Sequence, residues 1–396
     1  MAKHVPERRK REGHHSLVAL LKQRVFQIAC GYEDQDDSDA LRADPLLKLV
    51  CGSLPQTGAD LASQPTISRM ENAVNARSCY RMAEALFELY WRERAKNGTP
   101  KKVLLDLDST ADPTHGDREG SYYHGYYEQH IYHPLLVFDG ESGQPITALL
   151  RAGNTHASRS AVAVLKRIVA RMRRKWPEVE TELGADAGFA VPAVYEYCEK
   201  EGIDYTVGLI TNPRLEALAE GLLDEAKDRY DEAEGEKVRL FSEGAYQAGS
   251  WERKRRVIYK AEAMEQGTNT RFVVTSRTDG PKGLYEWYVR RGESEDWIKD
   301  FKPALKADRL SCHRFLANQF RLLSHAAAYW LMDTLRRKLV EAGVERMQLD
   351  TLRLSLIKIG GRVRQLLKKV RLHLASGHPG QRLWHMLSPA FESVRE

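Results

Sequence analysis

Hydrophobic and polar residues follow a helical period over most of the first 95 positions of the chain. The segments 16–31 (SLVALLKQRVFQIACG) and 76–96 are amphipathic, as expected of helices that cover a core. Asp44, followed by a proline, is typical of a helix start, and Thr66 is the expected cap of another short helix. The pattern predicts a helical N-terminal domain over residues 1–95.

From residue 101 the pattern changes to the two-residue period of strands. Three β-like segments, 101–110, 128–139 and 144–153, follow one another without a helix, which predicts an antiparallel meander. A helix over 157–176 comes next, and a strand, a helix and a strand then lead to residue 210. The order β-β-β-α-β-α-β predicts an α/β fold with a mixed sheet, of the RNase H-like kind.

The chain then departs from this alternation. A helix over 213–225, an acidic loop within 224–236 and three β-like segments predict a β-rich insertion, after which the pattern is helical again and finally basic. The predicted organisation is a helical N-terminal domain (1–95), a first part of the α/β core (96–212), the insertion (213–280), a second part of the core (281–342) and a basic C-terminal segment (343–396).

The composition is that of a folded protein without a membrane anchor. Of the 396 residues, 42% are hydrophobic, which is enough for a large core. No run approaches the ~18 apolar residues of a membrane helix, and Lys22 and Arg24 interrupt the apolar run that a signal peptide would need. The five cysteines are scattered without a CxxC pair, which disfavours disulfides and zinc sites. We expect a protein of the reducing cytoplasm with no membrane partner.

Charge is distributed unevenly along the chain. The segment from Arg353 to Arg382 contains eight Lys or Arg and no Asp or Glu, whereas residues 33–44 contain six acids and one arginine. A basic tail without acids favours a polyanionic partner, because each phosphate that it neutralises releases condensed counterions. A solvated charged face explains the charge alone equally well.

Acidic residues lie at the ends of two predicted strands. The run LLDLDST places Asp106 and Asp108 on the same strand face, and GADAGF places Asp186 at a strand end before a glycine turn. A carboxylate in such a place is costly unless it is solvated, paired or bound to a metal.

A polar stripe follows one predicted helix. At about 100° per residue, Tyr288, Arg291, Glu295 and Lys302 fall within about 60° of one another, and Lys299 borders them. A stripe that faces a core should be apolar. Taken alone, these residues are more simply a surface ladder of i,i+4 ion pairs, worth a few tenths of a kcal/mol each.

The strand acids and the helix stripe together suggest one site. Three carboxylates, Asp108, Asp186 and Glu295, make an oxygen-only site that suits Mg²⁺ or Mn²⁺. Two such ions promote phosphodiester displacement by activating a water or a 3′-hydroxyl. Arg291 and Lys302 then become candidate phosphate contacts.

These motifs resemble a known family. The spacing Tyr288-x2-Arg291-x3-Glu295-x6-Lys302 matches the Y-R-E-K signature of one class of bacterial insertion-sequence DDE transposases. The runs LDLDST, YHPLLVFDGESG, GNTHAS, GADAGF and YVRRGESEDWIKDFK occur in the order seen in the group-one DDE transposases, which are distantly similar to piggyBac-type enzymes. The resemblance covers roughly residues 15–375. It departs at Gly184, where the family more often has a basic residue.

The resemblance implies a DDE triad on an RNase H-like core. The family pattern Asp-x-Thr selects Asp108 as the first acid, with Asp106 in reserve, and Asp186 and Glu295 complete a set that binds two Mg²⁺ or Mn²⁺ ions. The residues that the resemblance implies for DNA binding are Tyr288, Arg291, Lys299, Lys302 and Trp297. Trp297, or else Trp251 or Trp287, would stack on a flipped base, and core packing is the alternative for each.

The resemblance also implies an activity. It is that of a cut-and-paste transposase, which binds double-stranded DNA at terminal inverted repeats, cuts the element ends and joins their 3′-hydroxyls to target DNA as a homodimer on paired ends. Two alternatives remain, an inactive or domesticated DNA-binding protein and an RNase H-like nuclease without strand transfer. The resemblance implies that residues 1–95 bind the DNA ends, that residues 96–212 and 281–342 form the catalytic core, and that the protein is associated with the nucleoid. Whether the N-terminal helices or the basic tail reads the DNA sequence stays open.

One further segment is rich in aromatic residues. Residues 115–133 (HGDREGSYYHGYYEQHIYH) concentrate histidines and tyrosines beside the first acidic strand. Rings interleaved with polar groups can stack on DNA bases, and ordinary packing is the alternative.

Overall fold

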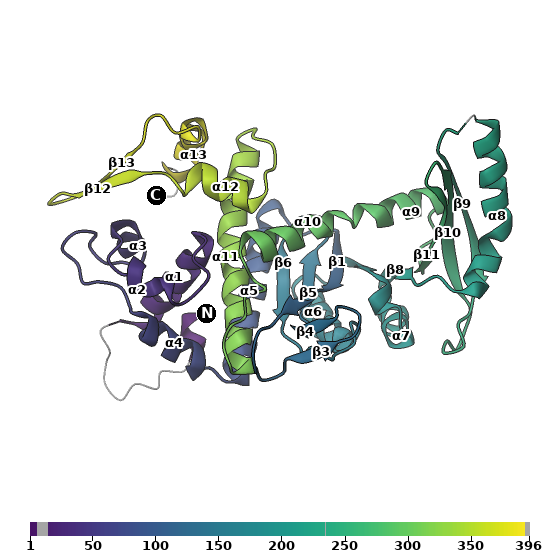
Figure 1. The fold of residues 1–396 in the computed structure, drawn as a ribbon, viewed down its shortest axis with the longest axis horizontal. Helices are drawn as coiled ribbons and strands as arrows, with labels where there is room; N and C mark the ends of the chain where they lie inside the picture. Colours follow the sequence, from purple (N-terminus) through teal and green to yellow (C-terminus); the bar gives the residue numbers. More distant parts are fainter. Residues whose placement is uncertain (6–14, 234, 393–396) are drawn as a thin grey trace.

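The computed structural model describes residues 1–5, 15–233 and 235–392, and it is built around one mixed sheet (Figure 1). The strands of this sheet are β1 (Lys102–Ser109), β5 (Leu135–Asp139), β6 (Pro145–Leu149), β7 (Glu180–Ala185), β8 (Asp204–Leu209), β9 (Val238–Tyr246), β10 (Arg255–Met264) and β11 (Gly267–Thr275). Their order across the sheet is β6-β5-β1-β7-β8-β11-β10-β9, with eight strands in all.

The first five strands of that order form the RNase H-like core. β1 pairs antiparallel with β5 and parallel with β7, and β7 pairs parallel with β8. The helices α6 (Ala161–Lys175) and α7 (Pro192–Glu201) connect the parallel strands. The buried side of α6 includes Leu165, Val169 and Met172, the apolar stripe that its sequence predicts. The predicted fold class is confirmed.

The predicted strand over 128–139 is two strands, so this expectation is corrected. A separate three-stranded sheet contains β2 (Asp112–Pro113), β4 (Gln129–Tyr132) and β3 (Tyr122–His124), in that order. Between β4 and β5 the chain passes through His133 and Pro134, and a proline has no N–H for either ladder. The chain therefore changes sheets at this point.

The insertion extends the core sheet. β11 pairs antiparallel with β8, with Val274 opposite Val207, and the helix α8 (Pro213–Glu232) packs on β9 and β10. The predicted acidic loop at 224–236 is also corrected, because most of it belongs to α8. This helix buries Leu215, Ala219 and Ala226, while its acids face solvent.

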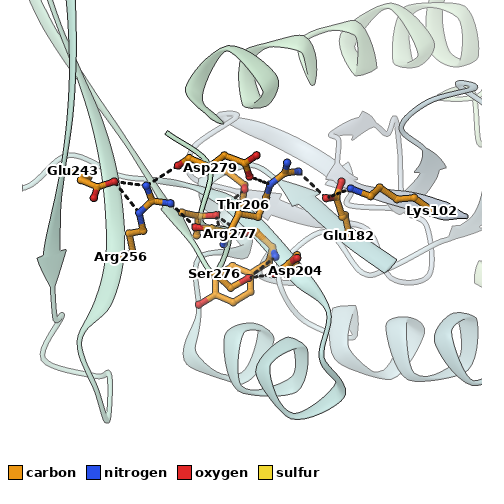
Figure 2. Close-up of polar contacts among 11 residues, drawn as sticks. Lys102, Glu182, Asp204, Thr206, Glu243, Arg256, Ser276, Arg277 and Asp279 are labelled. Atoms are coloured by element: carbon orange, nitrogen blue, oxygen red, sulfur yellow. Dashed lines mark hydrogen bonds and ion pairs between the residues drawn. The ribbon is translucent and has the colours of Figure 1, made fainter. Parts of the chain in front are cut away.

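Charged side chains tie the insertion to the core sheet (Figure 2). Arg277 Nη1 and Lys102 Nζ each donate to Oε1 of Glu182 over 2.8 Å, and Arg277 Nε donates to Asp279 Oδ2 over 2.8 Å. Arg256 Nη2 in turn donates to the carbonyl oxygen of Asp279 over 2.7 Å. The network links β1 and β7 of the core to β10 of the insertion.

The N-terminal segment is helical, as predicted. It contains η1 (Ala2–His4), α1 (Leu17–Ala29), α2 (Asp37–Leu41), α3 (Pro45–Val50), α4 (Gln64–Ala73), α5 (Ala76–Arg94) and η2 (Ala95–Asn97). Asp44 caps α3, since its carboxylate accepts from the amides of Leu46 and Leu47. Thr66 does not cap α4, because the helix begins at Gln64 and Thr66 lies within its first turn.

The helices after the insertion share their core with this N-terminal segment. They are α9 (Pro281–Arg290), α10 (Glu293–Lys299), the π-helical turn η4 (Asp300–Ala304) and α11 (Phe315–Glu341). α11 is the central helix in Figure 1, and it packs against α1, α4, α5 and β6. Arg24 of α1 and Glu71 of α4 form a fully buried ion pair of 2.6 Å beside it.

The C-terminal segment forms α12 (Leu349–Leu356), β12 (Gly361–Gln365), β13 (Val370–Leu374) and α13 (Gln381–Glu392). The strands β12 and β13 pair only with each other, as an antiparallel hairpin. Among the described residues, no helix is both long enough and apolar enough to cross a bilayer. All five cysteines are free thiols.

Candidate active site

Two acidic residues lie at neighbouring strand ends. β1 and β7 run parallel, with Leu107 opposite Ala185, so that Asp108 and Asp186 follow this pair at the same edge of the sheet. The side chain of Asp106 is 2% exposed and that of Asp108 is 16% exposed. The topology therefore brings Asp108 and Asp186 close to each other.

The carboxylate of Asp186 is held by the turn that follows it. Its Oδ1 accepts from the amide of Gly188 over 2.9 Å, at the start of the short helix η3 (Ala187–Phe189). A Cβ at Gly188 would lie 2.8 Å from Cβ of Ala157 and 3.1 Å from this carboxylate oxygen. The glycine therefore lets the turn close over Asp186.

Arg291 bridges the acids of β1. Its Nε donates to Asp106 Oδ1 over 2.7 Å, and its Nη2 donates to Asp108 Oδ2 over 3.4 Å and to the carbonyl of Leu107 over 3.1 Å. The side chain passes close to Gly184, where a Cβ would lie 3.4 Å from Cδ of Arg291. A Cβ at position 184 would thus be in ordinary van der Waals contact with Arg291.

The predicted stripe does not lie on one helix. α9 ends at Arg290, and the amides of Arg291 and Gly292 bond three residues back, to Tyr288 and Val289. The next helix, α10, begins after Gly292, a poor helix former. The single helix expected over 288–302 is therefore corrected to two helices and a π-helical turn.

Glu295 lies on α10 with an exposed side chain. Burial raises the pKa of Asp108 to about 6; Arg291 opposes the rise, and the charges of Asp186 and Glu295 add to it. Burial likewise raises the pKa of Asp106 to about 7, against the effect of Arg291. The four carboxylates therefore influence one another electrostatically, and Arg291 is the cation among them.

Lys302 contacts the segment that follows β1. Its Nζ donates to Thr110 Oγ1 over 2.8 Å and to the carbonyl of Ala111, and it lies 3.1 Å from Oδ1 of Asp112. Asp112 is 2% exposed, and burial raises its pKa to about 7 while Lys302 opposes that rise. Sequence reasoning missed Asp112, although it continues the acidic run of LDLDSTAD.

Tyr288 packs beside the Asp186 turn. Its hydroxyl donates to the carbonyl of Ala185 over 3.5 Å, and burial raises its pKa. A Cβ at Gly208 would lie 2.5 Å from this hydroxyl and 3.1 Å from the amide nitrogen of Ala187. Sequence reasoning also missed Gly208. The signal was available, because a glycine inside a predicted strand often marks a place where another segment approaches the backbone closely.

The other residues predicted to contact DNA are buried or paired within the protein. Trp297 is 2% exposed, its ring centroid is 5.7 Å from that of Phe138, and Gly143 packs against it, so the prediction that it stacks on a base is corrected to core packing. Trp251 is also buried. The ring of Trp287 is covered by Arg277 at 4.4 Å. Lys299 is exposed and pairs with Asp296 over 3.1 Å.

The aromatic segment borders the acids. The rings of His124, Tyr127 and His133 cluster with centroids 5.0, 5.4 and 6.1 Å apart. Burial raises the pKa of Tyr127, and the charges of Asp186 and Asp108 add to the effect. Tyr126, next to this cluster, is 84% exposed.

The donor set suits a divalent cation, although the side chains are not closed around one point. Among the described residues, no group of three or more His, Cys, Asp or Glu side chains is arranged to hold a metal ion. Asp108, Asp186 and Glu295 nevertheless supply only hard oxygen donors, and Oδ2 of the neighbouring Asp106 is buried without a hydrogen bond. The residues fit Mg²⁺ or Mn²⁺ in their chemistry.

Carboxylates at the adjoining ends of the central strands are donors of the kind that hold the metal ions of phosphodiester-cleaving sites. The chain belongs to the transposase DDE domain family, group 1, whose family model matches residues 1–395. No curated protein is significantly similar to it in sequence.

Two solved transposase structures are similar to this chain. The cryo-EM structure of a piggyBac transposase synaptic complex with hairpin DNA matches with a TM-score of 0.49 and 11% identity, over 90% of this chain and 74% of that chain. The Mos1 transposase paired-end complex with the left transposon end matches with a TM-score of 0.19 and 14% identity, over 50% of this chain and 60% of that one. Both TM-scores are below 0.5, so the family of this chain is assigned from the family match alone.

Proposed function

We propose that this protein is a DNA transposase that cuts the ends of its element and transfers the 3′-hydroxyl ends to target DNA. The observation that carries the proposal is the gathering of Asp108 and Asp186 at adjoining parallel strand ends, within electrostatic reach of Glu295. The family match over the whole chain supports the same reaction class.

Asp108, Asp186 and Glu295 would hold divalent cations, Mg²⁺ or Mn²⁺, and two ions are expected. Such ions, when bound, activate a water or a 3′-hydroxyl and stabilise the leaving oxygen of an in-line displacement. Glu295 is the exposed member of the set, so it is the carboxylate with most freedom to approach the two strand acids.

The remaining residues position this set. Arg291 orients Asp108 and places a cation beside it, and that cation is suited to a phosphate of the cut strand. Lys302 fixes the chain leaving β1 through Thr110 and Asp112 and has the same sign of charge. Tyr288 supports the turn that carries Asp186.

The partner in this proposal is double-stranded DNA, at the element ends and at the target. The similar piggyBac structure is a synaptic complex, and the similar Mos1 structure is a paired-end complex. Cutting two ends and joining them to one target needs two active sites, so a homodimer on paired ends is the assembly we propose.

The test uses linear DNA that carries the terminal inverted repeats flanking the gene, with Mg²⁺. Wild type is compared with Glu295→Gln and with Asp296→Asn, a control for the exposed neighbouring acid of α10. We expect wild type and the control to cut at the repeats and join the ends. Glu295→Gln should bind DNA and do neither.

Each other result selects a different function. Cleavage without end preference and without joining identifies a metal-dependent nuclease. Specific binding without cleavage by wild type identifies an inactive DNA-binding protein. Equal cleavage by wild type and Glu295→Gln refutes the role of Glu295.

A further inference from the structure

The C-terminal hairpin has two different faces. In an antiparallel pair, residues directly opposite one another share a face, and the next pair along lies on the other face. The pairs on one face are Arg362 with His373 and Arg364 with Arg371. The pairs on the other face are Gly361 with Leu374, Val363 with Leu372 and Gln365 with Val370. One face is therefore cationic and the other is mainly apolar.

The charge of the cationic face is not balanced within the chain. Arg362, Arg364 and Arg371 are exposed, and in the described part of the chain none of them pairs with a carboxylate. No Asp or Glu occurs between residues 353 and 382. Like charges directly opposite each other destabilise a hairpin, so the pairing of Arg364 with Arg371 costs stability in the isolated protein. A polyanion on this face removes that cost.

The tip of the hairpin carries the same sign. Lys368 and Lys369 lie in and next to the two-residue turn, closed by a bond of 2.8 Å from the amide of Leu366 to the carbonyl of Lys369. Both lysines are exposed. The turn therefore adds two positive charges, on flexible lysine side chains, to the three arginines of the strands.

The hairpin is held in a defined position. Oε1 of Gln365 accepts from the amide of Gln56 over 3.0 Å, and its Nε2 donates to Thr57 Oγ1 over 2.9 Å. The side chain of Gln56 also bonds to the backbone of β12, at the carbonyl of Val363 and the amide of Gln365, both over 3.3 Å. These contacts occupy the outer edge of β12 and leave the cationic face free.

The hairpin lies away from the acids. Figure 1 shows β12 and β13 on the side of α11 opposite to β1, and at the end of the molecule opposite to α8. A DNA duplex that enters the active site and also reaches the hairpin would contact it along base pairs beyond the cut. The face is thus suited to recognition rather than to chemistry.

We propose that the β12–β13 hairpin enters the major groove of double-stranded DNA near the transposon end. A two-stranded ribbon fits the major groove of B-DNA, and arginine there reads guanine O6 and N7 with two hydrogen bonds. Arg362, Arg364 and Arg371 read base edges, and the tip lysines contact phosphates. The identity of the DNA as the terminal repeat rests on the proposed function.

The test measures binding without cleavage. Full-length wild type and Arg364→Gln/Arg371→Gln are titrated, in EDTA and at several salt concentrations, onto a labelled duplex with the flanking inverted repeat and onto a scrambled duplex. The control is Arg229→Gln/Arg271→Gln, which removes two exposed arginines from the insertion. Methylation protection at guanine N7 reports on the major groove.

We expect the hairpin variant to lose about tenfold or more in affinity for the repeat and to lose most of its preference over the scrambled duplex. The slope of log affinity against log salt should stay close to that of wild type, because the tip lysines that contact phosphates remain. Protected guanines of wild type should become reactive. The control should match wild type in all three measurements.

Three results overturn the proposal. They are unchanged affinity in the hairpin variant, a loss of affinity with guanine protection intact, and no duplex binding by wild type. Circular dichroism and the unfolding temperature show that each variant is folded. The binding assay contains no free metal, so it can be interpreted even if wild type does not cleave DNA. The cleavage assay of Glu295→Gln can likewise be interpreted even if the hairpin variant binds DNA as wild type does.

Discussion

The guanidinium Nε of Arg291 lies 2.7 Å from Oδ1 of Asp106, and the two side chains are 13% and 2% exposed. The same guanidinium reaches Asp108 at 3.4 Å. Asp106 therefore anchors the arginine, and Asp108, the more exposed acid, is oriented by it. Two acids that are equivalent in the sequence run LDLD have different surroundings in the structure.

The first prediction separates these two acids. Asp108→Asn should abolish cleavage, because it removes a proposed metal-binding carboxylate, while leaving the unfolding temperature close to that of wild type. Asp106→Asn should destabilise the protein by about 3 kcal/mol, because it removes one partner of a buried ion pair. Its cleavage at low temperature should fall by a smaller factor, about 10 to 100.

Cleavage assays and thermal unfolding of both variants check this prediction. If Asp106→Asn is as stable as wild type and inactive, Asp106 is the metal-binding acid and Asp108 is not.

The second prediction concerns Gly208. A Cβ there would lie 2.5 Å from the hydroxyl of Tyr288 and 3.1 Å from the amide nitrogen of Ala187, and the second of these atoms belongs to the backbone. Gly208→Ala should displace Tyr288 and the Asp186 turn, lowering the cleavage rate about tenfold or more. Gly221→Ala on α8 is the control, since nothing lies within 4 Å of its Cβ.

Gly221→Ala should stabilise the protein by about 0.5–1 kcal/mol, as expected for an exposed helical glycine, with unchanged cleavage. The rate of end cleavage and the unfolding temperature of both variants are the measurements. A Gly208→Ala protein with the wild-type rate contradicts the tight packing of Tyr288.

The third prediction asks whether Lys302 acts on structure alone. Lys302→Met leaves Asp112 buried without its cation, which should cost about 3–5 kcal/mol of unfolding free energy. Adding Asp112→Asn should restore most of that stability, because the buried charge is gone. Lys299→Gln is the exposed control and should change stability by less than about 0.5 kcal/mol.

Cleavage by the double variant decides between two roles. If Lys302 also contacts a phosphate, the double variant is stable but impaired in cleavage and in the salt dependence of DNA binding. Full activity in the double variant would show that Lys302 only supports the exit of β1.

The fourth prediction is a pH dependence in the insertion. Burial of Glu262 would raise its pKa, but hydrogen bonds from Lys260, Lys237 and Arg239 outweigh this and lower the pKa to about 2, from 4.5. A lowered pKa means that the native state binds the proton less tightly than the unfolded state. The stabilisation is therefore complete above pH 4.5 and is lost as pH falls from there towards 2.

Glu262→Gln should accordingly lower the unfolding temperature at pH 7, and the difference from wild type should shrink as the pH is lowered from 4.5. Calorimetry of both proteins over this range is the measurement. A difference that stays constant with pH would mean that packing, and not the charge of Glu262, is responsible.

The sequence by itself determined the order of the core elements and the positions of the strand acids. A two-residue period puts Asp106 and Asp108 on one face, and the glycine turn after Asp186 ends its strand. These are local properties, set by the backbone repeat and by residues a few positions apart. The spacing around Glu295 was readable for the same reason.

Only the tertiary structure decided which groups meet. The helix over 288–302 breaks at Gly292, so the even stripe of an ideal helix does not form, and Trp297 turns into the core. Arg291 is paired with acids 183 and 185 positions away. Such partners depend on strand order and helix packing, which bring distant segments together and which no local period encodes.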